Sequence, residues 1–391
     1  MSEKKLQLPA RLEAMEPFRV MTVMRRATEL EASGRKIVHM EVGEPDFSTA
    51  GPIIEAGVKA LGDGLTQYTA AEGIPELRQA ISTHYQKRYG VQVNSDRIFI
   101  TPGASGGLVL CTNLLVNAGE GILLCDPAYP CYRNFIHMVG AEPQLVPVGI
   151  ETNFQPSVAT LDKHLKSNTT GLWLASPGNP TGTTMGRDEL VETLQWAEEK
   201  KLKVLVDEIY HGLHYVDDLP SALEMDTDTF IVNSFSKYFG MTGWRLGWIV
   251  VPPQYQEIVS ILAQNMYISA SSIAQHAALA AFSEETVPIL EQRRESFRAR
   301  RDYLSSALQD LGFKVSDEIQ GAFYIYAGIE RFSDNSEKFC ADILENHGVA
   351  ITPGTDFGVA GSNLTVRFAF TTDMDDLKLG VDRLTIALGN V

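Results

Sequence analysis

The chain has 391 residues, 44% of them hydrophobic, which is ample for a sizeable core in two to three domains, or in one large and one small. Its 33 basic and 49 acidic residues give a net charge of −16, which argues against general binding of nucleic acid or of anionic membranes. Four cysteines without CxxC pairs or metal spacing, and a first segment without the apolar core of a signal peptide, predict a cytoplasmic protein with reduced thiols, no metal site and no membrane span.

Short apolar segments alternate with helix-like segments through the middle of the chain. An amphipathic segment at 187–201 has its apolar residues at helical spacing. Buried apolar strands separated by helices indicate an α/β domain with a largely parallel sheet covered on both faces. The strand-like segments are rich in β-formers and punctuated by Gly, Pro or Asp, and they are 97–101, 121–126, 171–176, 203–207, 230–235 and 247–251.

The pattern changes near residue 284. A long charged helix pattern at 291–311 is followed by GAFYIY (321–326), another helix and LTVRFAF (364–370), which predicts a smaller α+β domain. We expect three parts along the chain: an N-terminal segment that packs with the small domain, the large domain, and the small C-terminal domain. Their predicted limits are residues 1–45, 46–285 and 286–391.

The segment TPGASGG (101–107) follows the first strand of this series. A glycine turn that opens a helix offers free backbone N–H groups and the positive end of the helix dipole, which suit a phosphate. Gly103, Ala104 and Ser105 are therefore candidates for holding an anion, with a plain Gly/Ser helix cap as the alternative. Because the segment is neither a GxGxxG fingerprint nor a Walker loop, the anion belongs to something other than NAD or ATP.

Polar or aromatic residues also follow the next three strands. Tyr129, between two prolines, is placed to lay its ring against a flat ligand, or else it packs under a loop. Asn179, in PGNPTG, can donate its amide to an oxygen anion, or it is part of an ordinary turn. Asp207 ends an apolar strand, where a carboxylate requires a cationic or hydrogen-bonding partner, and Tyr210 follows it; the alternative for Asp207 is a helix N-cap.

The segment NSFSKYFGMTGWRLGW (233–248) surrounds one lysine, Lys237, with hydroxyls, aromatic residues and glycines. A lysine at the mouth of the sheet can serve as a nucleophilic amine, and Arg245 forms a fork for a dianionic phosphate, with Ser234 and Ser236 completing the cup. These strand ends together specify a flat ring, a phosphate, a ring oxygen, a ring nitrogen and an aldehyde. That ligand is pyridoxal 5′-phosphate (PLP).

With these motifs the sequence resembles the fold-type I PLP enzymes, specifically class I/II aminotransferases of the aspartate aminotransferase superfamily. The resemblance covers roughly residues 40 to 370, and it implies a large domain with a mostly parallel seven-stranded sheet between helices plus a smaller α+β domain. The motifs that carry it are VGEPDF (42–47), QYTAAEGIPELR (67–78), TPGASGG, PGNPTG, DEIY (207–210), SFSKYFGMTGWRLGW (234–248), QGAFYIY (320–326), PGTDFG (353–358) and TVRFAF (365–370).

The resemblance implies a role for each matching residue. Lys237 matches the Schiff-base lysine and proton shuttle, Asp207 the partner of the pyridinium nitrogen, and Tyr129 the stacking aromatic. Tyr210 and Asn179 match the donors to the ring oxygen. The residues that match the phosphate cup are Ala104, Ser105, Ser234, Ser236 and Arg245.

Three further matches concern the partner subunit and the substrate. Tyr68 matches a tyrosine that reaches the phosphate of the neighbouring subunit, which implies a homodimer with shared active sites. Arg367 matches the arginine that binds the α-carboxylate, together with Asn179, and Gly43 lines the substrate. Without the family, Arg367 in its apolar strand would be interpreted as an edge residue whose charge reaches solvent.

The implied activity is a ping-pong transfer of the amino group between an L-amino acid and a 2-oxo acid, with glutamate/2-oxoglutarate expected as one pair. A PLP-dependent C–S lyase or an aminocyclopropane-carboxylate-synthase-like enzyme is an alternative on the same fold, and a non-catalytic effector-sensing domain is a second. The preferred amino acid stays open. Residues 104–118 contain no Lys or Arg to bind a second carboxylate, and Arg19, Arg25 and Arg26 are the remaining candidates in the N-terminal segment.

Overall fold

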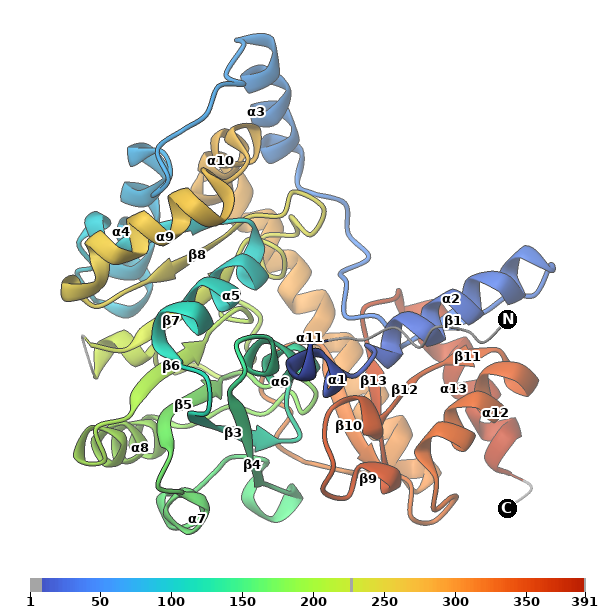
Figure 1. Ribbon diagram of the computed structural model, residues 1–391. Helices are drawn as coiled ribbons and strands as arrows, with labels where there is room; N and C mark the ends of the chain where they lie inside the picture. Colours follow the sequence, from blue (N-terminus) through green and yellow to red (C-terminus); the bar gives the residue numbers. More distant parts are fainter. Residues whose placement is uncertain (1–8, 226–227, 390–391) are drawn as a thin grey trace, which may run out of the picture.

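The computed structural model describes residues 9–225 and 228–389 (Figure 1). A seven-stranded sheet forms the centre of the larger part of the molecule, and it uses all six segments that the sequence predicts as strands. Its strands are parallel except for β8, which is antiparallel to both of its neighbours. The predicted α/β class with a mostly parallel seven-stranded sheet is therefore confirmed. Across the sheet the strands are β2 (Ile98–Thr101), β8 (Gly247–Val250), β7 (Phe230–Ser234), β6 (Lys203–Asp207), β5 (Thr169–Ala175), β3 (Gly121–Asp126) and β4 (Glu142–Pro147).

The strand β4 has no counterpart among the strands expected from the sequence. Its sequence, EPQLVP, contains two prolines, and only two of its positions are buried. It lies at the edge of the sheet, where prolines are tolerated because no further strand needs their missing N–H groups.

Helices cover both faces of this sheet and bury two apolar cores. Alternate side chains of the central strands point to opposite faces, so that Leu172 and Val206 belong to one core while Trp173 and Leu205 belong to the other. The first face is covered by α4 (Pro75–Tyr89), α8 (Arg187–Glu199) and α10 (Ser272–Leu279), and the second by α5 (Gly103–Leu115), α6 (Pro130–Met138) and α9 (Gln256–Tyr267). The carboxyl ends of the parallel strands are left open at one edge.

The smaller part is built on a four-stranded antiparallel sheet. Within the segment GAFYIY (321–326) the strand begins only at Tyr324, because Ala322 has a φ of 55° and Gly321 forms only an isolated bridge with His214. In order, its strands are β12 (Thr352–Pro353), β13 (Thr365–Ala369), β10 (Tyr324–Gly328) and β9 (Lys314–Val315), and its helices are α11 (Thr286–Leu311), α12 (Ser336–His347) and α13 (Met374–Leu388).

The N-terminal segment lies against this smaller sheet. The helix α2 (Arg19–Ala32) contacts β12, and β1 (Val38–His39) pairs in parallel with β11 (Val349–Ala350). Figure 1 shows α2, in blue, beside the C-terminal elements in red. The domain limits at residues 45 and 285 stay predictions. The remaining helices are α1 (Ala10–Glu13), α3 (Gly51–Gly62) and α7 (Val158–His164).

None of the helices within residues 9–225 and 228–389 combines the length and the apolar character that crossing a membrane requires. The cytoplasmic location expected from the sequence stays a prediction.

The end of β1 holds a histidine between two carboxylates, and this predicts a pH-dependent stability. His39 Nδ1 lies 2.8 Å from Glu41 Oε1, and Nε2 lies 3.1 Å from Glu31 Oε1. The hydrogen bond with Glu41 is the largest cause that raises the pKa of His39 from 6.5 to about 9. Because the folded-state pKa is the higher one, the contribution is complete below pH 6.5 and is lost as the pH rises through about 9.

We expect the His39→Gln variant to be less stable than the unmodified protein by about 1 kcal/mol at pH 6, allowing for screening at this partly exposed site. The difference should shrink toward pH 10. Urea unfolding of both proteins at pH 6, 8 and 10 measures it, and a difference that does not change with pH would contradict the prediction.

Candidate active site

A cavity of about 390 Å³ lies at the carboxyl ends of the sheet strands. Asp207 comes from the end of β6, Ser234 from the end of β7, and Arg367 from β13 of the smaller sheet. The residues predicted for the site all line this cavity, except Gly103 and Tyr68. Residues that the sequence places up to 324 positions apart, Gly43 and Arg367 among them, are thus brought to one space.

Lys237 projects into the cavity from the loop after β7. Its Nζ donates a hydrogen bond to the carbonyl oxygen of Gly43 at 2.8 Å, and the rings of Tyr210 and Phe323 lie 5.8 and 5.5 Å from it. In the described part of the chain, no carboxylate oxygen lies within ion-pair distance of this amine. The lysine is therefore held by a neutral acceptor and by aromatic rings, which leaves it available for chemistry.

Gly43 permits this contact. A Cβ added at position 43 would lie 1.7 Å from the phenolic oxygen of Tyr324, so that any other residue would displace the tyrosine. The backbone of residues 42–44 therefore forms part of the cavity wall at close range.

Asp207 is 3% exposed and has two hydrogen-bond donors of its own. The hydroxyl of Tyr132 donates to Oδ2 at 2.5 Å, and the backbone N–H of Ile209 donates to Oδ1 at 3.0 Å. Burial raises the pKa of Asp207 from 3.8 to about 6, against the opposing effects of these donors and of Lys237. Such a carboxylate is suited to face a protonated ring nitrogen, since a cation would keep it ionised. Sequence reasoning missed Tyr132, although it lies three residues after Tyr129 in PAYPCY.

Arg367 is 2% exposed and is held by neutral groups. Its Nη1 donates to Asn179 Oδ1 at 2.9 Å, and its Nη2 donates to the carbonyl oxygen of Glu41. Its guanidinium carbon lies 4.2 Å from the ring centre of Tyr324 and 4.6 Å from that of Phe357.

Arg367 forms no ion pair of 4.0 Å or less with any residue that the structure describes, although the more distant Asp356 carboxylate feels its charge, and its Nε has no hydrogen-bond partner there. A buried cation without a direct ion pair is unfavourable, so this guanidinium is arranged to receive an anionic ligand. The side-chain oxygen of Asn179 accepts the hydrogen bond from Arg367, so the amide N–H groups of Asn179 remain free to donate to a ligand.

Tyr210 and Tyr324 complete this side of the cavity. Their hydroxyls lie 3.0 Å apart, and burial raises the pKa of Tyr210 well above its ordinary value, so that its hydroxyl keeps its proton. Sequence reasoning included Tyr324 in the motif QGAFYIY (320–326) but assigned it no role in the site. Its position beside Gly43, Tyr210 and Arg367 results from contacts between distant segments.

A second group of donors gathers around the first turn of α5. Gly103 has a φ of 71°, and a Cβ there would lie 2.6 Å from Arg245 Nη2, so that glycine lets the guanidinium approach the helix N-terminus. A Cβ on Gly247 would likewise lie 2.7 Å from the Ala104 nitrogen. The hydroxyl of Ser234 accepts from the Ser236 N–H at 3.0 Å. Helix N–H groups, hydroxyls and a guanidinium form a suitable environment for a phosphate.

Tyr68 lies apart from this cavity, in the segment between α3 and α4. It is 79% exposed, and it does not line the site of its own chain.

The fold and this site define a PLP-dependent enzyme of fold type I. The chain belongs to the aminotransferase class I and II family, whose model matches residues 35–384. It is 36% identical over 380 residues to (5-formylfuran-3-yl)methyl phosphate transaminase of Methanocaldococcus jannaschii, with 96% of this chain and 98% of the other covered. It is 36% identical over 373 residues to valine–pyruvate aminotransferase of Mycobacterium tuberculosis, with 94% and 95% covered.

Solved structures of aminotransferases share this fold over nearly the whole chain. An aminotransferase from Mycobacterium tuberculosis superposes with a TM-score of 0.95 at 35% identity, covering 99% of this chain and all of the other. Aspartate aminotransferase from Thermus thermophilus with maleate has a TM-score of 0.91 at 29% identity, with coverages of 97% and 98%. The protein is therefore an aminotransferase, and its cofactor is PLP.

The residues present fit this cofactor. Although the chain carries a net charge of −16, Lys237, Arg245 and Arg367 all line the cavity. The group around α5 offers donors to a phosphate, and Asp207 offers a buried carboxylate to a ring nitrogen. The close approaches at Gly103 and Gly247 leave no room for side chains there, which keeps the α5 N-terminus open to a ligand.

Proposed function

We propose that this aminotransferase moves the amino group between an L-α-amino acid and a 2-oxo acid in two half-reactions, with Lys237 as the catalytic base. The observation that carries the proposal is one cavity with two cations that form no ion pair of 4.0 Å or less in the described residues, the Lys237 amine and the buried Arg367 guanidinium. The α-carboxylate of an α-amino acid is an anion that Arg367 can bind, and the α-proton is one that Lys237 can take.

When bound, PLP supplies an electron sink next to the substrate α-carbon. Arg367, which lines the cavity, binds the α-carboxylate through the Nη–H groups that Asn179 and Glu41 do not use, and this fixes the α-carbon. Lys237 Nζ takes the proton from that carbon and holds it until it is returned. Asp207 would hold the ring nitrogen in its protonated form, Tyr210 and Asn179 would donate to the ring oxygen, and Tyr129 would contact the ring. The phosphate-binding residues are Gly103, Ala104, Ser105, Ser234, Ser236 and Arg245.

The test follows the visible absorption of the PLP-loaded protein while single L-amino acids are added without a 2-oxo acid. We expect the bound-cofactor band to bleach with release of one 2-oxo acid per site, and a second 2-oxo acid to restore it. Continuous release of ammonia or pyruvate without an added 2-oxo acid would identify a lyase instead. A band that no amino acid changes would favour an effector-sensing domain.

We also propose that the chain acts as a homodimer in which Tyr68 reaches the phosphate site of the partner subunit. Two observations support this proposal. Tyr68 is exposed and lies outside its own cavity, and large apolar side chains lie exposed on the same part of the molecule. These apolar residues are Ile54, Val58 and Leu61 on α3, Leu65 after it, Ile258, Ile261 and Met266 on α9, and Ile268.

Hybrid dimers test this arrangement. Tyr68→Ala and Lys237→Ala subunits, each of low activity alone, should complement each other when co-expressed, because one site of each hybrid then contains an intact Tyr68 and an intact Lys237. With random assortment the mixture should regain roughly a quarter of the unmodified activity. Activity no higher than the sum of the two separate variants would contradict a contribution from the partner subunit.

A further inference from the structure

Part of the cavity wall is supplied by residues 16–21, which we call the N-terminal strap. Phe18, Val20 and Met21 of the strap line the cavity. The Phe18 ring packs edge-on against Tyr129, with 6.1 Å between the ring centres. Met21 is 50% exposed, so that half of its apolar surface has no cover in the described chain. The strap thus presents an apolar surface to whatever lies in the cavity.

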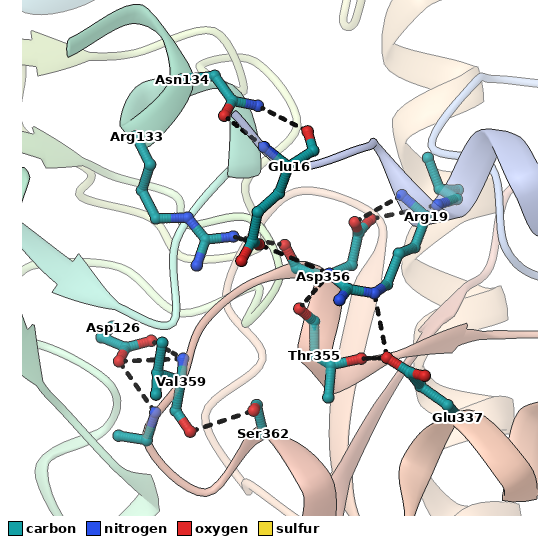
Figure 2. A network of polar contacts seen from close by, with 12 residues as sticks. Glu16, Arg19, Asp126, Arg133, Asn134, Glu337, Thr355, Asp356, Val359 and Ser362 are labelled. Atoms are coloured by element: carbon teal, nitrogen blue, oxygen red, sulfur yellow. Dashed lines mark hydrogen bonds and ion pairs between the residues drawn. The ribbon is translucent and has the colours of Figure 1, made fainter. Parts of the chain in front are cut away.

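Polar contacts fix the strap at one end to the large sheet domain. Glu16 and Asn134 of α6 exchange two hydrogen bonds of 3.3 Å between the backbone of the former and the side-chain amide of the latter. Arg133 Nη2 lies 3.6 Å from the Glu16 carboxylate. Figure 2 shows these groups together with those of the other end.

The other end of the strap is held by the loop after β12. Asp356 accepts the backbone N–H groups of Arg19 at 2.7 Å and of Val20 at 3.3 Å, which caps the first turn of α2. Arg133 Nη2 also donates to the Asp356 carbonyl oxygen at 3.0 Å (Figure 2). The backbone that carries Phe18, Val20 and Met21 is therefore held in a fixed position at the cavity.

None of the cations that line this cavity is left to bind a second carboxylate. Lys237, Arg245 and Arg367 are the cations among its lining residues, and each has a place in the proposed function. The other charged lining residues are the acids Asp207 and Glu44, and Glu44 is exposed, with its carboxylate accepting from the Thr242 hydroxyl at 2.5 Å.

The three arginines that the sequence offered for a second carboxylate do not line the cavity. Arg19 Nε lies 3.1 Å from Glu337, and Arg26 is bound at 2.6 Å by Glu345. Arg25 is exposed on α2. The segment around Tyr68 that the proposed dimer would bring in from the partner, residues 60–74, contains no Lys or Arg either.

We propose that the N-terminal strap is the side-chain-recognition wall of this enzyme, and that it selects amino acids with uncharged, apolar side chains over aspartate and glutamate. The inference rests on the proposed function. A second carboxylate would lose water against Phe18, Val20 and Met21 without meeting a cation, while an aliphatic or aromatic side chain would cover the exposed surface of Met21. This differs from the expectation that glutamate/2-oxoglutarate is one substrate pair.

The test compares kcat/KM for the first half-reaction of the PLP-loaded enzyme with leucine, methionine, phenylalanine, aspartate and glutamate. We expect the best apolar amino acid to exceed both acidic ones by at least about ten-fold. In the Met21→Arg variant, the ratio of kcat/KM for glutamate to that for leucine should rise by at least about ten-fold, because a cation then meets the second carboxylate.

Thr22→Arg is the matched control, since Thr22 is the next residue of α2, is exposed and does not line the cavity. It adds the same charge, and the ratio should stay within about two-fold of the unmodified enzyme. Because Met21 is half-exposed and Thr22 is exposed, we expect both variants to fold. Thermal unfolding of each variant beside the unmodified enzyme checks this.

Glutamate or aspartate as the best substrate of the unmodified enzyme would overturn the inference and leave the proposed function intact. An equal change of the ratio in the Met21→Arg and Thr22→Arg variants would overturn the role of the strap. Reaction with none of the amino acids would overturn the proposed function, and this inference with it.

Discussion

The Lys237→Ala variant should lose amino-group transfer by roughly 10⁴-fold or more, because no other amine in the cavity can take the α-proton. The other two cations that line the cavity, Arg245 and Arg367, are guanidinium groups and not amines, and the Asp207 carboxylate is already engaged by Tyr132 and Ile209. Single-turnover measurements on the PLP-loaded variant give the loss directly, free of any change in product release.

Two controls separate chemistry from folding in this prediction. Lys163→Ala removes an exposed lysine of α7 and should leave the rate unchanged. A small amine such as ethylamine should restore part of the Lys237→Ala activity, since it replaces the missing base. A Lys237→Ala variant with a rate within ten-fold of the unmodified enzyme would remove Lys237 from the mechanism.

The Arg367→Ala variant should raise KM by about 10²-fold or more for every amino acid tested, because truncation of a buried, hydrogen-bonded cation leaves the α-carboxylate unpaired. The preference between amino acids should stay the same, since the α-carboxylate is common to all of them. Arg367→Lys should recover little, because an ammonium cannot reproduce the contacts to Asn179 and Glu41 while binding a carboxylate in the same plane.

Steady-state kinetics with at least one apolar and one acidic amino acid tests this prediction. A rise in KM for only one of these amino acids would mean that Arg367 recognises the side chain of the substrate and not its α-carboxylate. The result would then also bear on the strap, since the preference between amino acids is assigned to Phe18, Val20 and Met21.

Much of the large sheet could be predicted from the sequence because buried parallel strands are short, nearly continuous apolar runs. The candidate site followed from the same pattern, since Asp207 and Ser234 end such strands and neighbouring parallel strands end at the same edge. The edge strand β4 was missed because an exposed edge imposes a weaker apolar pattern and tolerates proline.

The residues missed at the site have a different cause. The hydroxyls of Tyr210 and Tyr324 meet across 114 residues, and Arg367 reaches the Glu41 carbonyl across 326. The hydroxyl of Tyr132, on the helix α6 after β3, donates its hydrogen bond to Asp207, which is 75 residues away in the sequence. A tyrosine in an apolar segment is interpreted as a core residue unless its hydrogen-bond partner is known. That partner lies on another element, and local sequence spacing does not predict which elements pack together.

The arginines of the N-terminal segment were open candidates for a second carboxylate because the sequence leaves their partners unknown. Acids far along the chain, Glu337 and Glu345 of α12, bind Arg19 and Arg26 instead. The apolar residues beside them then face the cavity. This part of the site depends on which face of α2 packs against the smaller sheet.

The pairing of β1 with β11 sets an order of events during synthesis on the ribosome. Residues 38–39 pair with residues 349–350, so the N-terminal segment is made first but cannot dock until most of the chain has emerged. Asp356, which holds the strap, appears later still. The large sheet and its lysine can be in place before then, but Asp356 and Arg367 both emerge later, so a nascent chain that lacks them cannot form a complete site.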